Sequence, residues 1–245
     1  MNNHIDLLSK INHAHWSVLN PYFSNSSLNK SMRAGLTNIK KCGFLTDFNP
    51  QNALDYVSSI DSKVKVFDFK NPDYDQLGTI FDLIQAWGGQ TGRAPYVKKN
   101  NSPHKIKVSR LRFDEWKEDY LNGARSAKND RPVTALKEWV QIDGLGASFS
   151  PKHLRFWTNK YPVLDTRISL LLCGSKRLLL KPDYYDEFLS LITILSNIFS
   201  STILETEKAL FAFSQNYFIN EKLNFKDDHF TDKTDYEIAE LLATL

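Results

Sequence analysis

The chain has 245 residues and a mass of 28.2 kDa, and 42% of its residues are hydrophobic, so it can bury a core in one large domain or two small ones. A formal net charge of +3 and a sequence pI near 8.7 are compatible with a nucleic-acid partner, but an ordinary basic cytosolic protein has the same balance. Only Cys42 and Cys173 are present, which excludes a disulfide framework and a zinc knuckle.

The N-terminal stretch lacks the basic segment and apolar core of a signal peptide, and the longest apolar run, residues 189–204, is interrupted by Ser and Asn. We therefore expect a cytoplasmic chain that does not enter a membrane. His4, His13 and His15 have no Cys or Asp cluster near them, so no metal site is predicted there.

Apolar spacing predicts a mainly α-helical fold. Residues 4–11, 32–39 and 52–60 have helical patterns, whereas residues 63–70 (KVKVFDFK) alternate apolar and polar side chains and form the one predicted strand. We expect residues 1–74 to form an N-terminal helical region that packs with the C-terminal helices. Residues 75–245 are expected to form the core of the fold. The two regions can also form one continuous domain.

The stretch after residue 75 combines a buried helix with a polar turn. Apolar residues at helical spacing run from Leu77 to Trp87, Gly88 and Gly89 end the helix, and Gln90 to Arg93 form a compact turn. By itself this pattern describes a core helix followed by a solvated arginine. Residues 97–110 then carry five Lys or Arg and no acid, which suits either a solvated loop or a segment that follows phosphates.

Residues 113–121 form another predicted helix, and residues 124–130 a polar linker. The next helix presents Val133, Leu136, Trp139 and Val140 on one face. It leads into a turn in which Gly144 and Gly146 bracket Leu145. Bare glycine amides in such a turn can approach another molecule closely, although a Gly-x-Gly between helices is more often only a tight turn.

A second helix follows with a full start signal. Ser150 is the predicted N-cap, Pro151 suits the first helical position, and Phe149 can pack across the cap onto Leu154. Lys152 lies in the first turn, where the helix dipole disfavours an ammonium and is expected to lower the lysine pKa, so this amine is a nucleophile candidate.

Asp165 follows a short connector and is predicted to cap the next helix. Taken alone, Asp165 is a helix cap and Lys152 a solvated charge, and only their order after the glycine turn suggests more.

That order resembles the helix-hairpin-helix DNA glycosylases, and most closely their 8-oxoguanine glycosylase branch. The resemblance covers residues 131–172 and, loosely, 75–96. In familiar members the lysine follows the second glycine sooner and the aspartate follows the lysine later; here the intervals are six and thirteen residues. The lysine assignment depends on the spacing more than the aspartate assignment does.

The resemblance implies roles for particular residues. It implies that Lys152 attacks the sugar C1′ and that Asp165 stabilises the positive charge that develops on the sugar. The remaining implied roles fall into two groups, DNA contact and lining of the base pocket. The DNA contacts are Gly144, Leu145, Gly146, Gln90, Arg93, Lys98 and Lys99, and the pocket residues are Trp87, Trp157 and Phe211.

The implied activity is excision of a modified base from double-stranded DNA by a monomeric enzyme, with AP lyase activity if the lysine forms a Schiff base. The modified base is expected to be 8-oxoguanine-like or a hypermodified phage base such as glucosylated hydroxymethylcytosine, which would make the enzyme a repair or an antiviral protein. No cofactor is expected: the cysteine cluster that holds iron–sulfur in some relatives is missing, although hairpin carbonyls can hold a monovalent cation.

Two alternatives remain open. The hairpin can belong to a non-catalytic module that only grips DNA phosphates, or the chain can be a helical scaffold with an ordinary glycine corner. The C-terminal helices expected at residues 184–200, 202–217 and 232–245 contain no recognisable constellation of functional residues and favour none of these hypotheses.

Overall fold

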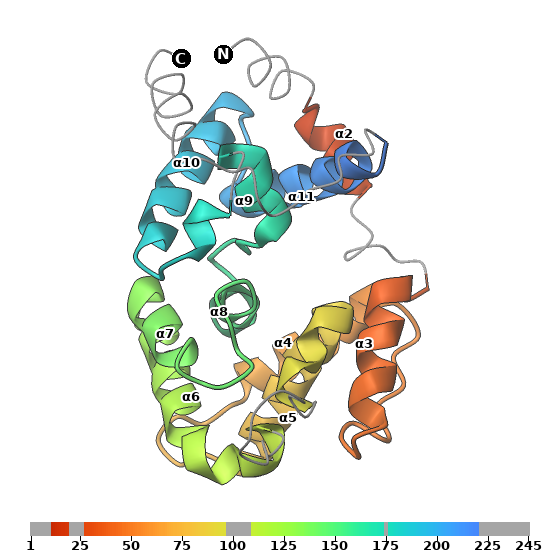
Figure 1. Cartoon of the computed structure of the whole chain (residues 1–245), viewed down its shortest axis with the longest axis vertical. Helices are drawn as coiled ribbons and strands as arrows, with labels where there is room; N and C mark the ends of the chain where they lie inside the picture. Colours follow the sequence, from red (N-terminus) through yellow and green to blue (C-terminus); the bar gives the residue numbers. More distant parts are fainter. Residues whose placement is uncertain (1–10, 20–26, 97–108, 174–175, 221–245) are drawn as a thin grey trace, which may run out of the picture. The chain divides into compact units, whose positions relative to one another are not determined.

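The fold is mainly α-helical, as predicted (Figure 1). The computed structural model describes the chain apart from five segments: residues 1–10, 20–26, 97–108, 174–175 and 221–245. Within the described part there is no strand, and the only strand-like pairing is an isolated antiparallel bridge between Ser27 and Asn52. The expected helices at residues 4–11 and 232–245 lie wholly or mostly outside the described residues.

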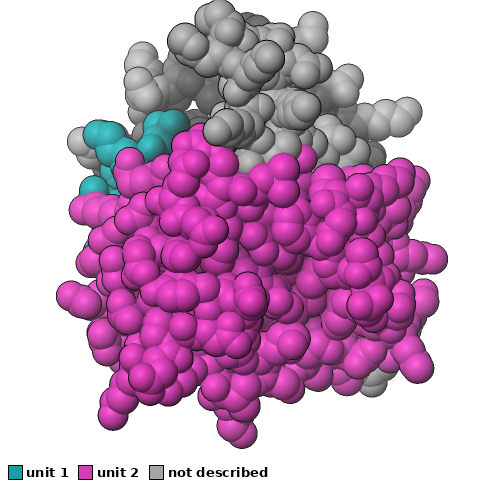
Figure 2. Space-filling model, turned by 90° about the horizontal axis from the view of Figure 1, so that it is seen from below, with its two compact units in different colours: residues 1–21, 160–245 teal, residues 22–159 magenta. Residues whose placement is uncertain are grey.

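The chain divides into two compact units, coloured separately in Figure 2. Unit 1 consists of residues 1–21 and 160–245, and unit 2 consists of residues 22–159. The N-terminal residues thus group with the C-terminal helices only as far as residue 21, and the following residues group with the central segment.

Unit 2 holds helices from α3 to α8 together with two short 3₁₀ helices. They are α3 (Lys30–Lys40), α4 (Ala53–Lys65), α5 (Tyr74–Trp87), η2 (Gly89–Tyr96), η3 (Ser109–Arg112), α6 (Phe113–Lys128), α7 (Pro132–Trp139) and α8 (Ser150–Thr158). The starts of α3, α4 and α5 are set by asparagine or aspartate caps, whose side chains accept hydrogen bonds from first-turn amides.

Helix α5 is the centre of unit 2. It contacts α3, α4, α6, α8 and η2, and every residue from Leu77 to Trp87 except Thr79 is buried. A helix that is buried on all sides must satisfy its polar side chains internally. This requirement shapes the polar cluster described below.

The predicted strand at residues 63–70 is wrong. Helix α4 continues through Lys65, and Val64 is buried one turn after Ile60 and two turns after Tyr56. Val66, which the alternating pattern pairs with Val64, is 70% exposed. The helical spacing of buried residues from the preceding segment therefore prevails over a short alternation.

The predicted linker at residues 124–130 is also wrong over most of its length, because α6 continues through Lys128. Ala124 and Ala127 are fully buried, and small residues let α7 pack closely against α6 (Figure 1). A Cβ added at Gly123 would lie only 2.2 Å from the indole nitrogen of Trp139. The predicted polar linker is thus part of the helix–helix interface.

Unit 1 contains the helices α2 (His13–Val18), α9 (Thr166–Cys173), α10 (Tyr184–Ile198) and α11 (Ile203–Asn220), with η4 (Arg177–Leu179). Helix α11 is central, since α2, α9 and α10 all contact it. Glu207, which interrupts its apolar stripe, is nevertheless buried. Among the described residues no single helix has the length and apolar composition of a membrane span, and only the sharply bent pair α10 and α11 meets these criteria jointly.

Candidate functional site

The helices α7 and α8 form the expected hairpin around the glycine turn. Gly144 has a φ of +90°, a conformation that strains any L side chain, so glycine is required there. Leu145 is fully buried, so its side chain lies in the core. The predicted contact of this side chain with DNA is therefore wrong. Gly146 is exposed, and a Cβ added to it would meet nothing within 4 Å.

The turn directs its carbonyl groups inward. The Gly146 carbonyl accepts hydrogen bonds from the amides of Phe149 and Ser150, at 2.8 and 3.0 Å. Within the described part of the chain, no hydrogen bond engages the amides of Gly146, Ala147 or Ser148. The hairpin therefore presents N–H groups that can donate to an anion at an exposed glycine.

Ser150 is not the N-cap that the sequence predicted. Phe149 occupies the cap position without a side-chain hydrogen bond, and Ser150 is the first helical residue. The Ser150 hydroxyl turns back and donates to the carbonyls of Leu145 and Gly146, at 3.4 and 3.3 Å. Pro151 does lie in the first turn, as predicted. The α8 N-terminus thus has no side-chain oxygen that accepts from its first amides.

Lys152 lies in the first turn of α8, half-buried, and folds back onto the hairpin. Its Nζ donates to the Ser148 carbonyl at 2.9 Å and lies 4.6 Å from the centre of the Phe149 ring. A carbonyl acceptor and an aromatic face both suit a charged ammonium. For Lys152 to attack a sugar carbon, its amine must first leave the Ser148 carbonyl.

Asp165 caps α9 in unit 1, as predicted. Its Oδ1 accepts hydrogen bonds from the amides of Arg167 and Ile168, at 2.9 and 3.0 Å. Both bonds end on Oδ1, so the cap fixes the orientation of the carboxylate without using Oδ2. The side chain is partly exposed. Lys152 belongs to unit 2 and Asp165 to unit 1, with the division falling between Asn159 and Lys160.

The three proposed pocket aromatics do not belong to one unit. Trp87 and Trp157 lie in the packed core of unit 2, whereas Phe211 lies on α11 of unit 1 and is partly exposed. Trp157 is fully buried, and its indole N–H donates to the Tyr120 hydroxyl at 3.1 Å. These contacts give Trp157 a structural role in the core of unit 2.

Gln90 and Arg93, to which the resemblance gives DNA contacts, lie in η2, which begins directly after the α5 cap at Gly88. The compact turn predicted there is a 3₁₀ helix that includes Pro95. The side chains of Gln90 and Arg93, and all of Lys98 and Lys99, lie outside the described residues.

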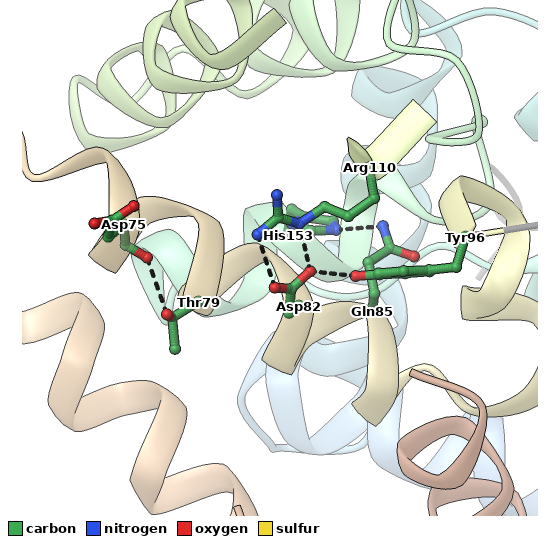
Figure 3. Close-up of polar contacts among 7 residues, drawn as sticks. All are labelled: Asp75, Thr79, Asp82, Gln85, Tyr96, Arg110 and His153. Atoms are coloured by element: carbon green, nitrogen blue, oxygen red, sulfur yellow. Dashed lines mark hydrogen bonds and ion pairs between the residues drawn. The ribbon is translucent and has the colours of Figure 1, made fainter. Parts of the chain in front are cut away.

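A buried polar cluster in unit 2 was not anticipated from the sequence. His153 on α8 is fully buried, and one of its ring nitrogens contacts the Tyr120 hydroxyl at 2.7 Å. The other ring nitrogen contacts the Gln85 amide nitrogen at 3.0 Å (Figure 3). Burial lowers the His153 pKa well below its ordinary value, and the neighbouring Lys152 charge lowers it further. The imidazole is therefore neutral, donating through one nitrogen and accepting through the other.

A second part of the cluster is centred on Asp82. The Arg110 guanidinium donates to both carboxylate oxygens, at 2.7 and 2.9 Å, and the Tyr96 hydroxyl donates to Oδ1 at 2.5 Å (Figure 3). Burial raises the pKa of the Asp82 carboxyl, and the hydrogen bonds and charge of Arg110 offset part of this rise. Tyr96 and Arg110, which lie fourteen residues apart in the sequence, thus bind the same buried carboxylate.

One sequence signal could have revealed this cluster. Asp82 and Gln85 lie three residues apart within a helix that is apolar on nearly every side, where polar residues require internal partners. His153 lies three and four residues before Phe156 and Trp157, on the buried face of α8. The identity of the partners, which come from α6, η2 and η3, depends on tertiary structure.

Within the described residues, no group of three or more His, Cys, Asp or Glu side chains has the arrangement of a metal site. No family model matches the chain, and the comparisons with curated proteins and with solved structures found no match either. Local geometry and the sequence resemblance are therefore the basis for a functional hypothesis.

Proposed function

We propose that the chain is a DNA N-glycosylase that excises a modified base from double-stranded DNA. The observation that carries this proposal is the fixed carboxylate of Asp165, held at the head of α9 by two amide hydrogen bonds, one connector after the α7–α8 hairpin. Loss of the base leaves positive charge on the sugar, and a carboxylate held in a set orientation stabilises such charge without reorganising. Within this proposal, Asp165 is the residue that stabilises the transition state.

The hairpin supplies the DNA contact in this proposal. The exposed Gly146 and the neighbouring amides without internal partners suit a phosphate oxygen, to which amides donate strong hydrogen bonds. The target nucleotide must leave the base stack, at a cost of a few kcal/mol, so the enzyme also needs a group that fills the gap. We assign that task to Gln90 in η2, and the contact with the estranged partner base to Arg93 in the same element.

Lys152 is proposed as the nucleophile, with its amine moving from the Ser148 carbonyl to the sugar C1′. Nζ first loses a proton, so that it attacks as a neutral amine. The bond from C1′ to the base nitrogen breaks as the bond to Nζ forms, the base leaves with the electron pair and takes up a proton, and Nζ releases its extra proton to solvent. The C1′–O4′ bond of the amine adduct then breaks, O4′ takes up a proton, and the resulting Schiff base permits β-elimination of the 3′ phosphate.

A non-catalytic DNA-binding module is the second candidate, favoured by one specific observation. Lys152 is already engaged by Ser148 and Phe149, as expected of a lysine that stabilises the hairpin. A module of this kind binds duplex DNA through the same amides but releases no base.

Excision assays separate the two candidates. The protein is incubated with duplex oligonucleotides that each carry one oxidised, alkylated or hypermodified base, and abasic sites are detected as alkali-labile breaks. Release of at least one base supports the glycosylase. Duplex binding without release of any base supports the module, and absence of both indicates a helical scaffold.

A further inference from the structure

Helix α3 has a cationic outer face that the proposed function does not use. Lys30, Arg33 and Lys41 are exposed, and Lys40 is half-buried with its Nζ donating to the Asn49 side chain at 2.7 Å. The helix contains no aspartate or glutamate.

These cations share one side of the helix. Residues 30, 33, 37 and 41 are separated by three or four positions, so they line one face over about 16 Å, with the exposed Thr37 between the charges. The opposite face carries Met32, Leu36 and Ile39, which are buried. The separation of charge and core is therefore complete along this helix.

The position of this face is fixed by close backbone packing. A Cβ added at Gly35 would lie 2.3 Å from the Ala86 carbonyl oxygen and 2.9 Å from the Gly89 Cα. Gly89 itself has a φ of +79°, and its missing side chain leaves room for Ser31. Helix α3 thus packs directly on the junction between α5 and η2 through the side of the helix that carries Gly35, and its cationic face lies on another side.

The cations on α3 differ from those at the start of α6 in the ion pairs that they form. None of Lys30, Arg33, Lys40 and Lys41 forms an ion pair in the described part of the chain. At the start of α6 the cations are paired differently: Lys117 with Asp114, and Arg112 with Glu115. A row of unpaired cations attracts a polyanion, whereas a row of ion pairs does not.

We propose that the outer face of α3, through Lys30, Arg33 and Lys41, binds the sugar–phosphate backbone of the DNA duplex. This inference rests on the proposed function for the identity of the polyanion. Phosphates follow one another about every 3.4 Å along the axis for each strand, so the face spans roughly five nucleotides. Such contacts supply affinity that depends on salt and not on sequence.

The test is the salt dependence of binding to an unmodified fluorescent duplex by the full chain. The variant is Lys30→Gln/Arg33→Gln/Lys41→Gln, and the matched control is Lys63→Gln/Lys65→Gln/Lys70→Gln, which removes three charges from α4 and the loop after it. Each phosphate contact releases about 0.9 counterion, so log K falls with log salt in proportion to the number of contacts. The α3 variant loses three contacts, and the magnitude of its slope is expected to decrease by about 2.7. The magnitude of the slope of the control is expected to decrease by less than about 0.5. Thermal unfolding verifies that all three proteins are folded.

Equal slopes for the wild type and the α3 variant, or equal losses in the variant and the control, would overturn the inference. So would loss of binding to anionic phospholipid vesicles with duplex binding unchanged. Single-turnover excision at saturating protein separates this test from the proposed function. If the α3 variant has the wild-type slope and the wild type excises a base, only the α3 surface is refuted. If the slope of the variant is less steep but the wild type excises no base, only the glycosylase proposal is refuted.

Discussion

At the scale of single residues, the position of Lys152 in its helix and the contacts of its amine have opposite effects on its positive charge. Its place in the first turn of α8 disfavours positive charge, but the Ser148 carbonyl and the Phe149 ring stabilise that charge. A structural lysine and a nucleophilic lysine therefore share the same resting geometry. They differ in whether another cation can replace the amine.

The variant Lys152→Arg separates these roles. Arginine retains a cation that can reach the Ser148 carbonyl but does not form a Schiff base, so we expect borohydride trapping on modified duplex DNA to disappear. Single-turnover excision is expected to fall by about 100-fold or more, the range typical of a lost catalytic group.

Lys152→Gln is the companion variant, because it removes both the charge and the nucleophile. Near wild-type excision by Lys152→Arg, combined with a loss of stability in Lys152→Gln, would instead assign Lys152 a structural role.

At the scale of elements, the two hairpin glycines have different tasks. Gly144→Ala forces a side chain into a φ of +90° and is expected to lower the free energy of unfolding by about 1–2 kcal/mol. Gly146→Ala meets no atom within 4 Å, so we expect a change of less than about 0.5 kcal/mol. Denaturant unfolding measures both.

Duplex binding by the same two variants tests the contact role of the hairpin. If a phosphate approaches the amides at Gly146, the added methyl group obstructs one charge-assisted hydrogen bond worth about 1.5–3 kcal/mol. Affinity for DNA should then fall about 10–100-fold in Gly146→Ala. Unchanged affinity in this stable variant would remove the hairpin from the DNA contact surface.

Most helices were predictable because they combine apolar spacing with local start signals. Asn52 caps α4 and Asp165 caps α9, and both act through first-turn amides that lie next to them in the sequence. The error at residues 63–70 arose because strict alternation covers only residues 63–66 (KVKV), which carry less information than the helical register continuing from Tyr56. Ser150 was misassigned because a hydroxyl can donate to preceding carbonyls as well as accept from following amides.

The buried cluster was harder to predict, because its partners come from distant parts of the chain. His153 meets Tyr120 and Gln85, which are 33 and 68 residues away. Nothing local to SPKHLRFW specifies those partners. The sequence indicates only that a histidine on a buried helix face needs them.

At the scale of the whole molecule, His153 couples the stability of unit 2 to pH. Its folded pKa is well below 6.5, because burial disfavours the imidazolium. Below about pH 6.5 the unfolded chain binds a proton that the folded unit does not, so stability falls as the pH drops. Above that pH the histidine is neutral in both states and its contribution is constant.

The expected loss approaches about 1.4 kcal/mol for each pH unit below 6.5, until the folded pKa is reached. Tryptophan fluorescence during denaturant unfolding reports this, since four of the five tryptophans belong to unit 2 and only Trp16 belongs to unit 1. His153→Gln should reduce this pH dependence, and His15→Gln on unit 1 should not. The same slope in all three proteins would refute the assignment.

The division of the molecule into two units places Lys152 and Asp165 in different units, joined by the connector after Asn159.

The most direct test of the account is the excision rate of Asp165→Asn on the modified base that the wild type releases. Asparagine is as good an N-cap as aspartate, so the variant should unfold at nearly the wild-type temperature and bind duplex DNA with similar affinity. We expect single-turnover excision to fall by about 100-fold or more, because the amide cannot stabilise positive charge on the sugar. Excision at the wild-type rate by this folded, DNA-binding variant would contradict the central role of the carboxylate.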